Sequence, residues 1–134
     1  MTELTNRAAP IYADHMPITI LEKSHGVYLL ETTFSDYHLN AAGSVHGGML
    51  SAFLDCGLAG GASWADGDGT GSYGITMTMT VNFVSGAGPG TLKCAARIQG
   101  GGRTTRFVEA VLFTDNEKAP IATATGAVRV IPLP

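Results

Sequence analysis

The sequence is poor in charge and in cysteine. Only 14% of its 134 residues are charged, and eight basic against eleven acidic side chains give a net charge of −3. No basic cluster is present that would neutralise phosphates, so we expect no nucleic-acid partner. Because few charges are available to cover a folded surface, we expect part of that surface to meet another subunit.

Long apolar runs and metal-binding spacings are missing as well. No window approaches the roughly 18 apolar residues that a membrane span needs, and the first residues lack the pattern of a secretion signal. We therefore expect a cytoplasmic protein that does not bind membranes. Cys56 and Cys94 are too few for a disulfide scaffold and too far apart for a Cys-x-x-Cys pair. We expect both to be buried small hydrophobes, with no metal and no cofactor.

Glycine is abundant, with 18 residues, but two glycine-rich motifs lack the context of their usual functions. The Gly-x-Gly-x-x-Gly spacing from Gly69 to Gly74 precedes a predicted strand, whereas a dinucleotide fingerprint follows a strand and opens a helix. The stretch from Asp66 resembles half of a calcium loop, but Met77 stands where the bidentate Glu should be. Neither motif therefore predicts a ligand.

Hydrophobic periodicity predicts one α+β domain over residues 1–134. Apolar residues recur at three- and four-residue spacing from Gly47 to about Trp64, which predicts one long helix. The predicted strands are Ile18–Lys23, Val27–Phe34, Tyr73–Val84, Thr91–Gln99, Thr104–Thr114 and Ala119–Ile131. The late strands are joined by short turns, so we expect a mainly antiparallel sheet covered by the helix. Residues 1–15 form an N-terminal segment, with a short helix expected over Leu4–Asp14.

Two finer predictions concern the strand after the helix and the polar loops. In Tyr73–Val84 the apolar residues from Ile75 to Phe83 alternate with polar ones, which predicts a strand with one apolar face. The stretch Asp36–Val45 has the composition of a loop. The histidines expected to be solvated in such polar contexts are His15, His25 and His38.

One stretch carries chemistry, and it leads into the helix: Asn40-Ala-Ala-Gly43-Ser-Val-His46-Gly47-Gly48. The first N–H groups of a helix have no partner within it, and they attract negative charge. Two glycines there let another molecule approach the backbone, as an oxyanion does in acyl transfer. The alternative is that Gly47 and Gly48 only permit tight packing of the helix on the sheet.

Asp55 lies between Leu54 and Cys56 on this apolar helix. A partly desolvated carboxylate implies a partner or a function, although an exposed position or a hydroxyl partner would also explain it. Eight helical residues separate Gly47 from Asp55 by about 12 Å. One carbonyl can hardly contact both in one chain, so if they act together a two-fold dimer is the active unit.

The pattern Asn40-x-x-Gly43-x-x-His46-Gly47-Gly48 followed by Asp55 resembles hotdog-fold acyl-CoA thioesterases of the phenylacetic-acid-degradation (PaaI-like) group. The resemblance implies a hotdog fold, one long central helix packed on a curved, mainly antiparallel sheet. It also implies a homodimer, with dimers often paired into a homotetramer. The activity it implies is hydrolysis of an acyl- or aryl-CoA thioester to free acid and CoA, with CoA as part of the substrate.

The resemblance further implies roles for single residues. The Gly47 N–H would polarise the thioester carbonyl, Asn40 and His46 would shape its pocket, and Asp55 of the other subunit would act as nucleophile or general base. Thr76 falls where these enzymes often place a hydroxyl that orients water or the carboxylate. An outward Thr of an alternating strand is the alternative for Thr76.

Substrate-binding residues follow from the same resemblance. The turn Gly101, Gly102, Arg103 and Thr104 would lie near the CoA phosphates or pantetheine, with charge from Arg103 or Arg106; a solvated turn is the alternative. Gly48 would contact the substrate at the helix start. Acyl-pocket candidates, each of which could equally belong to the core, are Met49, Phe53, Leu54, Trp64 and Tyr73. A related aryl-CoA subgroup has Glu and Thr where this chain has Asp55 and Ala59, which argues against a 4-hydroxybenzoyl substrate.

Two other functions remain open for the same fold. One is an acyl-CoA hydratase or dehydratase, which usually pairs a loop histidine with a helix carboxylate at a different spacing. The other is a non-catalytic acyl-CoA binding module, which would bind tightly without releasing thiol.

Overall fold

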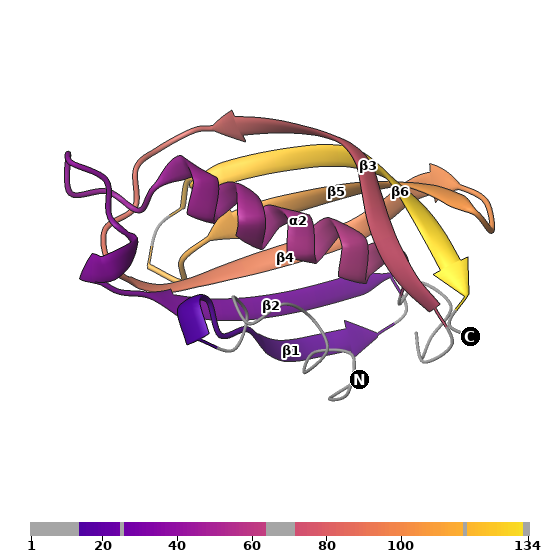
Figure 1. Ribbon diagram of the computed structural model, residues 1–134, viewed down its shortest axis with the longest axis horizontal. Coiled ribbons are helices and arrows are strands. Elements are labelled where there is room, and N and C mark those ends of the chain that lie inside the picture. The colour runs from indigo at the N-terminus through magenta and orange to yellow at the C-terminus, as the bar shows by residue number, and fades with distance from the viewer. Residues whose placement is uncertain (1–13, 25, 64–71, 117, 133–134) are drawn as a thin grey trace.

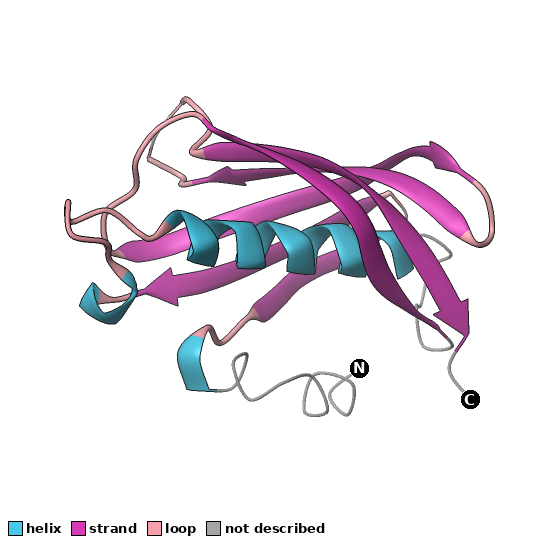
Figure 2. Cartoon of the chain, turned by 45° about the horizontal axis from the view of Figure 1, so that its top comes forward, coloured by secondary structure: helices cyan, strands magenta, loops and turns pink. Residues whose placement is uncertain are grey.

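The computed structural model describes residues 14–24, 26–63, 72–116 and 118–132. Within them, one α-helix crosses a six-stranded sheet (Figures 1 and 2). The elements are β1 (Thr19–Ser24), β2 (Val27–Phe34), the short 3-10 helix η2 (Asp36–His38), α2 (Gly47–Ser63), β3 (Ser72–Phe83), β4 (Gly90–Gly101), β5 (Thr105–Phe113) and β6 (Ala122–Pro132). This confirms the α+β hotdog architecture. The short helix expected from Leu4, together with His25 and Trp64, falls outside the described residues.

The sheet has the order β1-β2-β4-β5-β6-β3, and every neighbouring pair is antiparallel. The predicted strands are all present, although β6 begins at Ala122 rather than Ala119. The chain leaves β2, crosses the sheet as α2 and returns as β3, which places β3 at the edge opposite β1 (Figure 1). No helix of the described part is long and apolar enough to cross a membrane.

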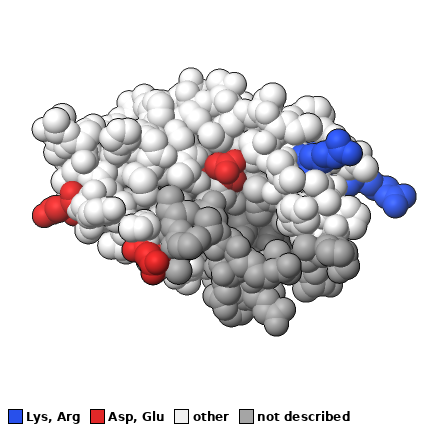
Figure 3. Space-filling model, in the orientation of Figure 1, with Lys and Arg blue, Asp and Glu red and all other residues white. Residues whose placement is uncertain are grey.

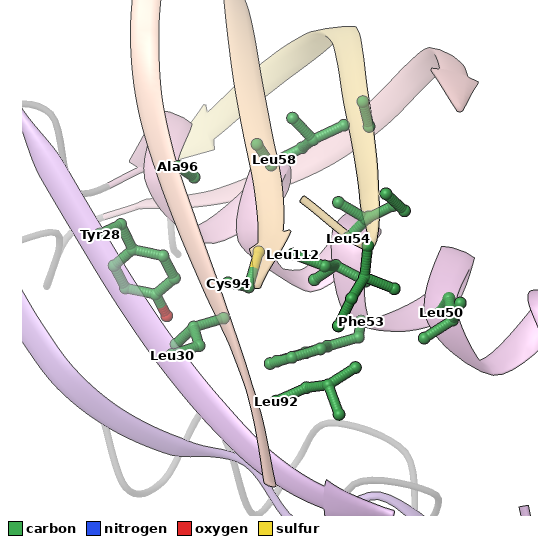
Figure 4. Packing of buried hydrophobic residues seen from close by; sticks show 14 of the residues in the cluster. Tyr28, Leu30, Leu50, Phe53, Leu54, Leu58, Leu92, Cys94, Ala96 and Leu112 are labelled. Atoms are coloured by element: carbon green, nitrogen blue, oxygen red, sulfur yellow. The ribbon is translucent and has the colours of Figure 1, made fainter. Parts of the chain in front are cut away.

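The core lies between α2 and the concave face of the sheet (Figure 4). From the helix, Phe53, Leu54 and Leu58 are fully buried. They pack with the inward residues of the strands, among them Leu30, Leu92, Cys94, Val108 and Leu112. Burying one such large side chain stabilises the fold by roughly 1.5–3 kcal/mol, so this layer supplies much of the driving force for folding.

Glycines let α2 approach the sheet closely. A Cβ on Gly57 would lie 2.5 Å from the Sγ atom of Cys94, and one on Gly60 would overlap the ring of Tyr28. Burial raises the pKa of the Cys94 thiol. Cys94 is therefore buried as predicted, whereas Cys56 is only partly buried and that part of the prediction is wrong.

The prediction of one apolar face along β3 is wrong for its first half. Ile75 and Met77 are 46% and 49% exposed, whereas Met79 and Val81 pack against the core. The pairing of β3 with β6 shifts register between Thr76 and Thr78, so Met77 is the extra residue of a β-bulge. Because residues two apart share a face only in an unbroken strand, the bulge exchanges inner and outer positions.

Candidate functional site

Asn40 organises the loop that leads into α2. Its Oδ1 atom accepts hydrogen bonds from the N–H groups of Ala42 (2.9 Å) and Ser44 (3.1 Å). Gly43, in the same loop, has a φ of +82°, a conformation that side chains disfavour. The Asn40 N–H donates to the Ser44 carbonyl at 2.7 Å and closes the turn. The side chain of Asn40 thus fixes the path of the backbone toward His46.

His46 caps the N-terminus of α2. Its carbonyl accepts from the N–H groups of Met49 (2.9 Å) and Leu50 (3.1 Å), and its Nδ1 atom accepts from the Gly48 N–H at 2.9 Å. Three of the first four N–H groups of the helix are therefore occupied. The Gly47 N–H is the fourth, and it has no acceptor among the described residues.

Packing within the chain does not require glycine at position 47. A Cβ there would meet only the ring of Phe83, at 3.4 Å, which is an ordinary contact. On Gly48 a Cβ would lie 3.1 Å from Nδ1 of His46, which is tight but touches only a side chain. The close-packing explanation therefore does not hold for Gly47, in contrast to Gly57 and Gly60.

Asp55 lies on the side of α2 that turns away from the buried stripe, and its side chain is half-buried. No hydrogen-bond donor or basic side chain of the described residues pairs with its carboxylate. Within the described part of the chain, neither a hydroxyl partner nor a salt bridge therefore accounts for this carboxylate.

Thr76 lies on the inner face of β3, because it pairs with the buried Val128 and its own hydroxyl is buried. The outward alternative is therefore wrong. The hydroxyl has no hydrogen-bond partner among residues 14–24, 26–63, 72–116 and 118–132, and a buried polar group without a partner is destabilising.

Two contacts show which part of α2 lies at the height of Thr76. A Cβ on Gly74 would overlap the carbonyl oxygen of Ala59, and Phe83 lies against Gly47, so β3 runs antiparallel to α2. Two residues of strand from Gly74 to Thr76 span about 6.6 Å, and four residues of helix from Ala59 to Asp55 span about 6 Å. Thr76 is therefore level with Asp55 on the same chain.

The β4–β5 turn lies at the other end of α2. Gly101 has a φ of +109°, and a Cβ on it would overlap the carbonyl of Thr105 across the turn, so the turn itself requires this glycine. Arg106 is buried: its Nε atom donates to the Gly102 carbonyl at 3.0 Å and its Nη1 atom donates to the Ala62 carbonyl. A cation at the C-terminus of a helix is favourable. Arg106 thus anchors the turn to α2.

All four residues of this turn are exposed: Gly101, Gly102, Arg103 and Thr104. On the face seen in Figure 3, the basic side chains lie at the end of the molecule where Figure 1 shows this turn, and acidic side chains stand apart from one another. The surface between them is largely uncharged, as the composition suggested.

The pocket candidates divide between the surface and the core. Met49 and Tyr73 are half-buried, whereas Phe53 and Leu54 are fully buried. The Phe53 ring meets the Phe34 ring edge to face, with centroids 6.2 Å apart, so it packs within the core. No group of three possible metal ligands occurs in the described residues.

Sequence reasoning missed a pocket at the start of α2. Its volume is about 290 Å³, and it is lined by Tyr37, His38, Leu39, His46, Gly48 and Met49. The prediction that His38 is solvated is wrong: its ring is buried, accepts from the Ser35 N–H at 3.0 Å through Nδ1, and bonds the His15 carbonyl through Nε2. His15 is exposed as predicted. The bond between His38 and His15 spans 23 positions, which no local pattern reveals.

Several solved structures have the same fold, and the similarity to each covers most of this chain. A thioesterase family protein from Silicibacter pomeroyi has a TM-score of 0.83 at 22% identity, covering 98% of this chain and 96% of that one. The Escherichia coli PaaI protein from the phenylacetic acid degradation operon has a TM-score of 0.79 at 20% identity, with coverages of 97% and 90%. A Streptococcus mutans protein bound to acetyl-CoA has a TM-score of 0.71 at 25% identity, with coverages of 86% and 89%.

Comparison with the curated proteins finds no match. The family model of the thioesterase superfamily matches residues 42–121, which include the helix start, all of α2 and the three strands β3, β4 and β5. The chain belongs to the thioesterase superfamily.

Proposed function

We propose that this protein hydrolyses an acyl-CoA thioester to a free acid and CoA. The observation that carries the proposal is the Gly47 N–H, which has no acceptor in the part of the chain that the structure describes. It stands at the N-terminus of a 17-residue helix whose neighbouring N–H groups are taken. A fixed donor at a helix N-terminus stabilises the oxyanion that forms when a thioester carbonyl is attacked. Asn40 and His46 hold the loop and cap that keep this donor in place.

Asp55 supplies the second half of the reaction. Its carboxylate either attacks the carbonyl carbon, forming a mixed anhydride and expelling CoA thiolate, or removes a proton from a water molecule that attacks instead. In both routes water finally provides the hydroxyl of the acid, and the thiolate takes up a proton. The lack of a partner for Asp55 within the described residues supports this role, as does the orphan hydroxyl of Thr76 at the same level.

The site needs two subunits, because Gly47 and Asp55 are about 12 Å apart along one helix. The outer edge of β3 suits a two-fold contact: the strand has 12 residues, contains no charge and no proline, and ends the sheet. Such an edge is a template for pairing with a second strand. Antiparallel pairing of two β3 strands would bring the Gly47 end of one α2 toward Asp55 of the other.

This arrangement also suggests where the CoA part of the substrate binds. We place the CoA phosphates near Arg103, with Gly101, Gly102 and Thr104 lining the turn and Arg106 holding it to the helix. Acetyl-CoA bound to the similar S. mutans protein supports an acyl-CoA ligand. Association of two dimers into a tetramer, the extent of the domain over residues 1–134 and a cytoplasmic location remain predictions.

A subunit-mixing experiment tests the proposal. Gly47 is the first residue of α2, where proline is tolerated, so Gly47→Pro removes the N–H donor and keeps the helix. Asp55→Asn removes the carboxylate. Each variant alone should lose at least about a hundredfold of the wild-type rate on a panel of acyl-CoA substrates, measured by thiol release, because every site of either homodimer lacks one group.

After denaturation and joint refolding, a mixed dimer contains one site with both groups, so an equal mixture should recover about a quarter of wild-type activity. No recovery in the mixture would contradict the shared site. A wild-type protein that binds acyl-CoA tightly but releases no thiol, or that hydrates enoyl-CoA instead, would overturn the thioesterase proposal.

A further inference from the structure

One side of the pocket beside the start of α2 is held in place by hydrogen bonds, and the proposed reaction assigns these residues no role. Both ring nitrogens of His38 are bonded, to the Ser35 N–H and the His15 carbonyl, so its ring is fixed. The His46 N–H donates to the His38 carbonyl at 2.9 Å, which ties this wall directly to the helix cap. The pocket is thus held rigidly against Gly48.

Tyr37 is the exposed part of this wall. Its side chain is 74% exposed, the largest exposure of any large hydrophobic residue described. Its ring nevertheless has a defined position, stacked on His15 at 5.8 Å and edge-on to His38 at 5.4 Å. A tyrosine joins an apolar ring to a polar hydroxyl, and such side chains are enriched at interfaces where one end meets an apolar group and the other meets water.

Resting on the proposed function, we infer that this pocket, between Tyr37, His38 and Leu39 on one side and Met49 on the other, binds the acyl group of the substrate. It would accept neutral, apolar acyl groups, either alkyl or aryl, and exclude acyl groups that carry a second carboxylate.

The position of the pocket assigns it to the acyl group and not to CoA. The ring of Phe83 covers one side of Gly47, whereas His46 and Gly48 open onto the pocket. In the two-fold arrangement the partner's helix continues from its Asp55 toward its own β4–β5 turn, where Arg103 is exposed. CoA leaves the reacting carbonyl in that direction, and the acyl substituent, on the other side of the carbonyl, enters the pocket.

The chemistry of the lining sets the selectivity. None of the residues that line the pocket is Asp, Glu, Lys or Arg. His38 has both ring nitrogens engaged, so it offers no further donor to an anion. His46 accepts the Gly48 N–H at Nδ1, so its Nε2 N–H is the one imidazole donor left in the lining. A carboxylate moved from water into this pocket would lose hydration and gain no Lys or Arg partner, and the N–H groups of Gly48 and Met49 beside the pocket are already taken by His46, so the transfer is unfavourable. An apolar chain gains from the same transfer.

The test compares Tyr37→Ala with Phe107→Ala. Phe107 is also an aromatic residue with a half-exposed side chain, but it lies on β5, outside the pocket and the proposed catalytic residues. Values of kcat/KM are measured for acetyl-, hexanoyl-, phenylacetyl- and succinyl-CoA. Wild type should prefer hexanoyl- and phenylacetyl-CoA over succinyl-CoA by at least roughly a hundredfold.

In Tyr37→Ala, kcat/KM for the two apolar substrates should fall roughly fivefold to tenfold, while that for acetyl-CoA stays unchanged. Phe107→Ala should leave all four values unchanged. An equal loss for all substrates, acetyl-CoA included, would show that the pocket binds CoA and would overturn the inference. Unchanged values in Tyr37→Ala, or efficient hydrolysis of succinyl-CoA, would also overturn it. Thiol release from none of the substrates by wild type would instead contradict the proposed function.

Discussion

The glycines of α2 look alike in the sequence, but they form two groups that differ in whether the neighbouring atoms leave room for a side chain. At Gly57 and Gly60, an added Cβ would overlap a side chain of the sheet, so glycine there is a condition for packing. At Gly47 an added Cβ would meet one ring at an ordinary distance, and its N–H has no acceptor among the described residues. The first group explains how the helix sits on the sheet. The second leaves a donor that only a molecule from outside the described chain can use.

The largest expected effect comes from removing the Gly47 N–H donor, which should change activity and leave stability nearly unchanged. Gly47→Pro should lower kcat for a good substrate by about 10²–10³-fold, equivalent to about 2.7–4 kcal/mol, because one oxyanion donor is lost. The free energy of unfolding, measured with urea, should stay within about 0.5 kcal/mol of wild type, because proline fits the first helical position.

Gly47→Ala is the matched control, since it adds a Cβ and keeps the N–H group. Its loss of kcat should be clearly smaller than that of Gly47→Pro. If the two variants were equally impaired, the effect would come from the added carbon atoms and the N–H would not be the oxyanion donor.

The packed glycines should show the reverse behaviour. Gly57→Ala places a methyl group 2.5 Å from the Sγ atom of the buried Cys94, and the short Cys side chain can move little. Overpacking of this kind costs about 1–3 kcal/mol, partly offset by a gain of up to about 1 kcal/mol in helix propensity. Urea denaturation should therefore show a net loss of about 1–2 kcal/mol. Wild-type stability in Gly57→Ala would remove the distinction between the two groups.

How far the sequence predicts this molecule depends on whether a feature is local. The spacing of apolar residues from Gly47 onward predicted α2 almost to its last residue, and the rise per residue of a helix already separated Gly47 from Asp55. The face that Thr76 occupies was not predictable in this way, because the bulge at Met77 depends on pairing with β6, some fifty residues later. The burial of His38 likewise depends on a carbonyl 23 positions away.

Thr76 offers the smallest and most specific test, because its environment resembles that of Gly47: a polar group of the described chain without a partner. Valine has the shape of threonine, so Thr76→Val replaces an unsatisfied buried hydroxyl by a methyl group. The free energy of unfolding should rise by about 1 kcal/mol, since the desolvation cost disappears.

Thr80→Val on the same strand is the control, because Thr80 is exposed and its hydroxyl already contacts water; we expect a change within about 0.5 kcal/mol. If the Thr76 hydroxyl orients water or Asp55 during the reaction, kcat should fall in Thr76→Val even as stability rises. A variant that is more stable and equally active would leave Thr76 outside the reaction. A less stable one would mean that the hydroxyl has a partner in the assembled protein, which would place it at the subunit contact.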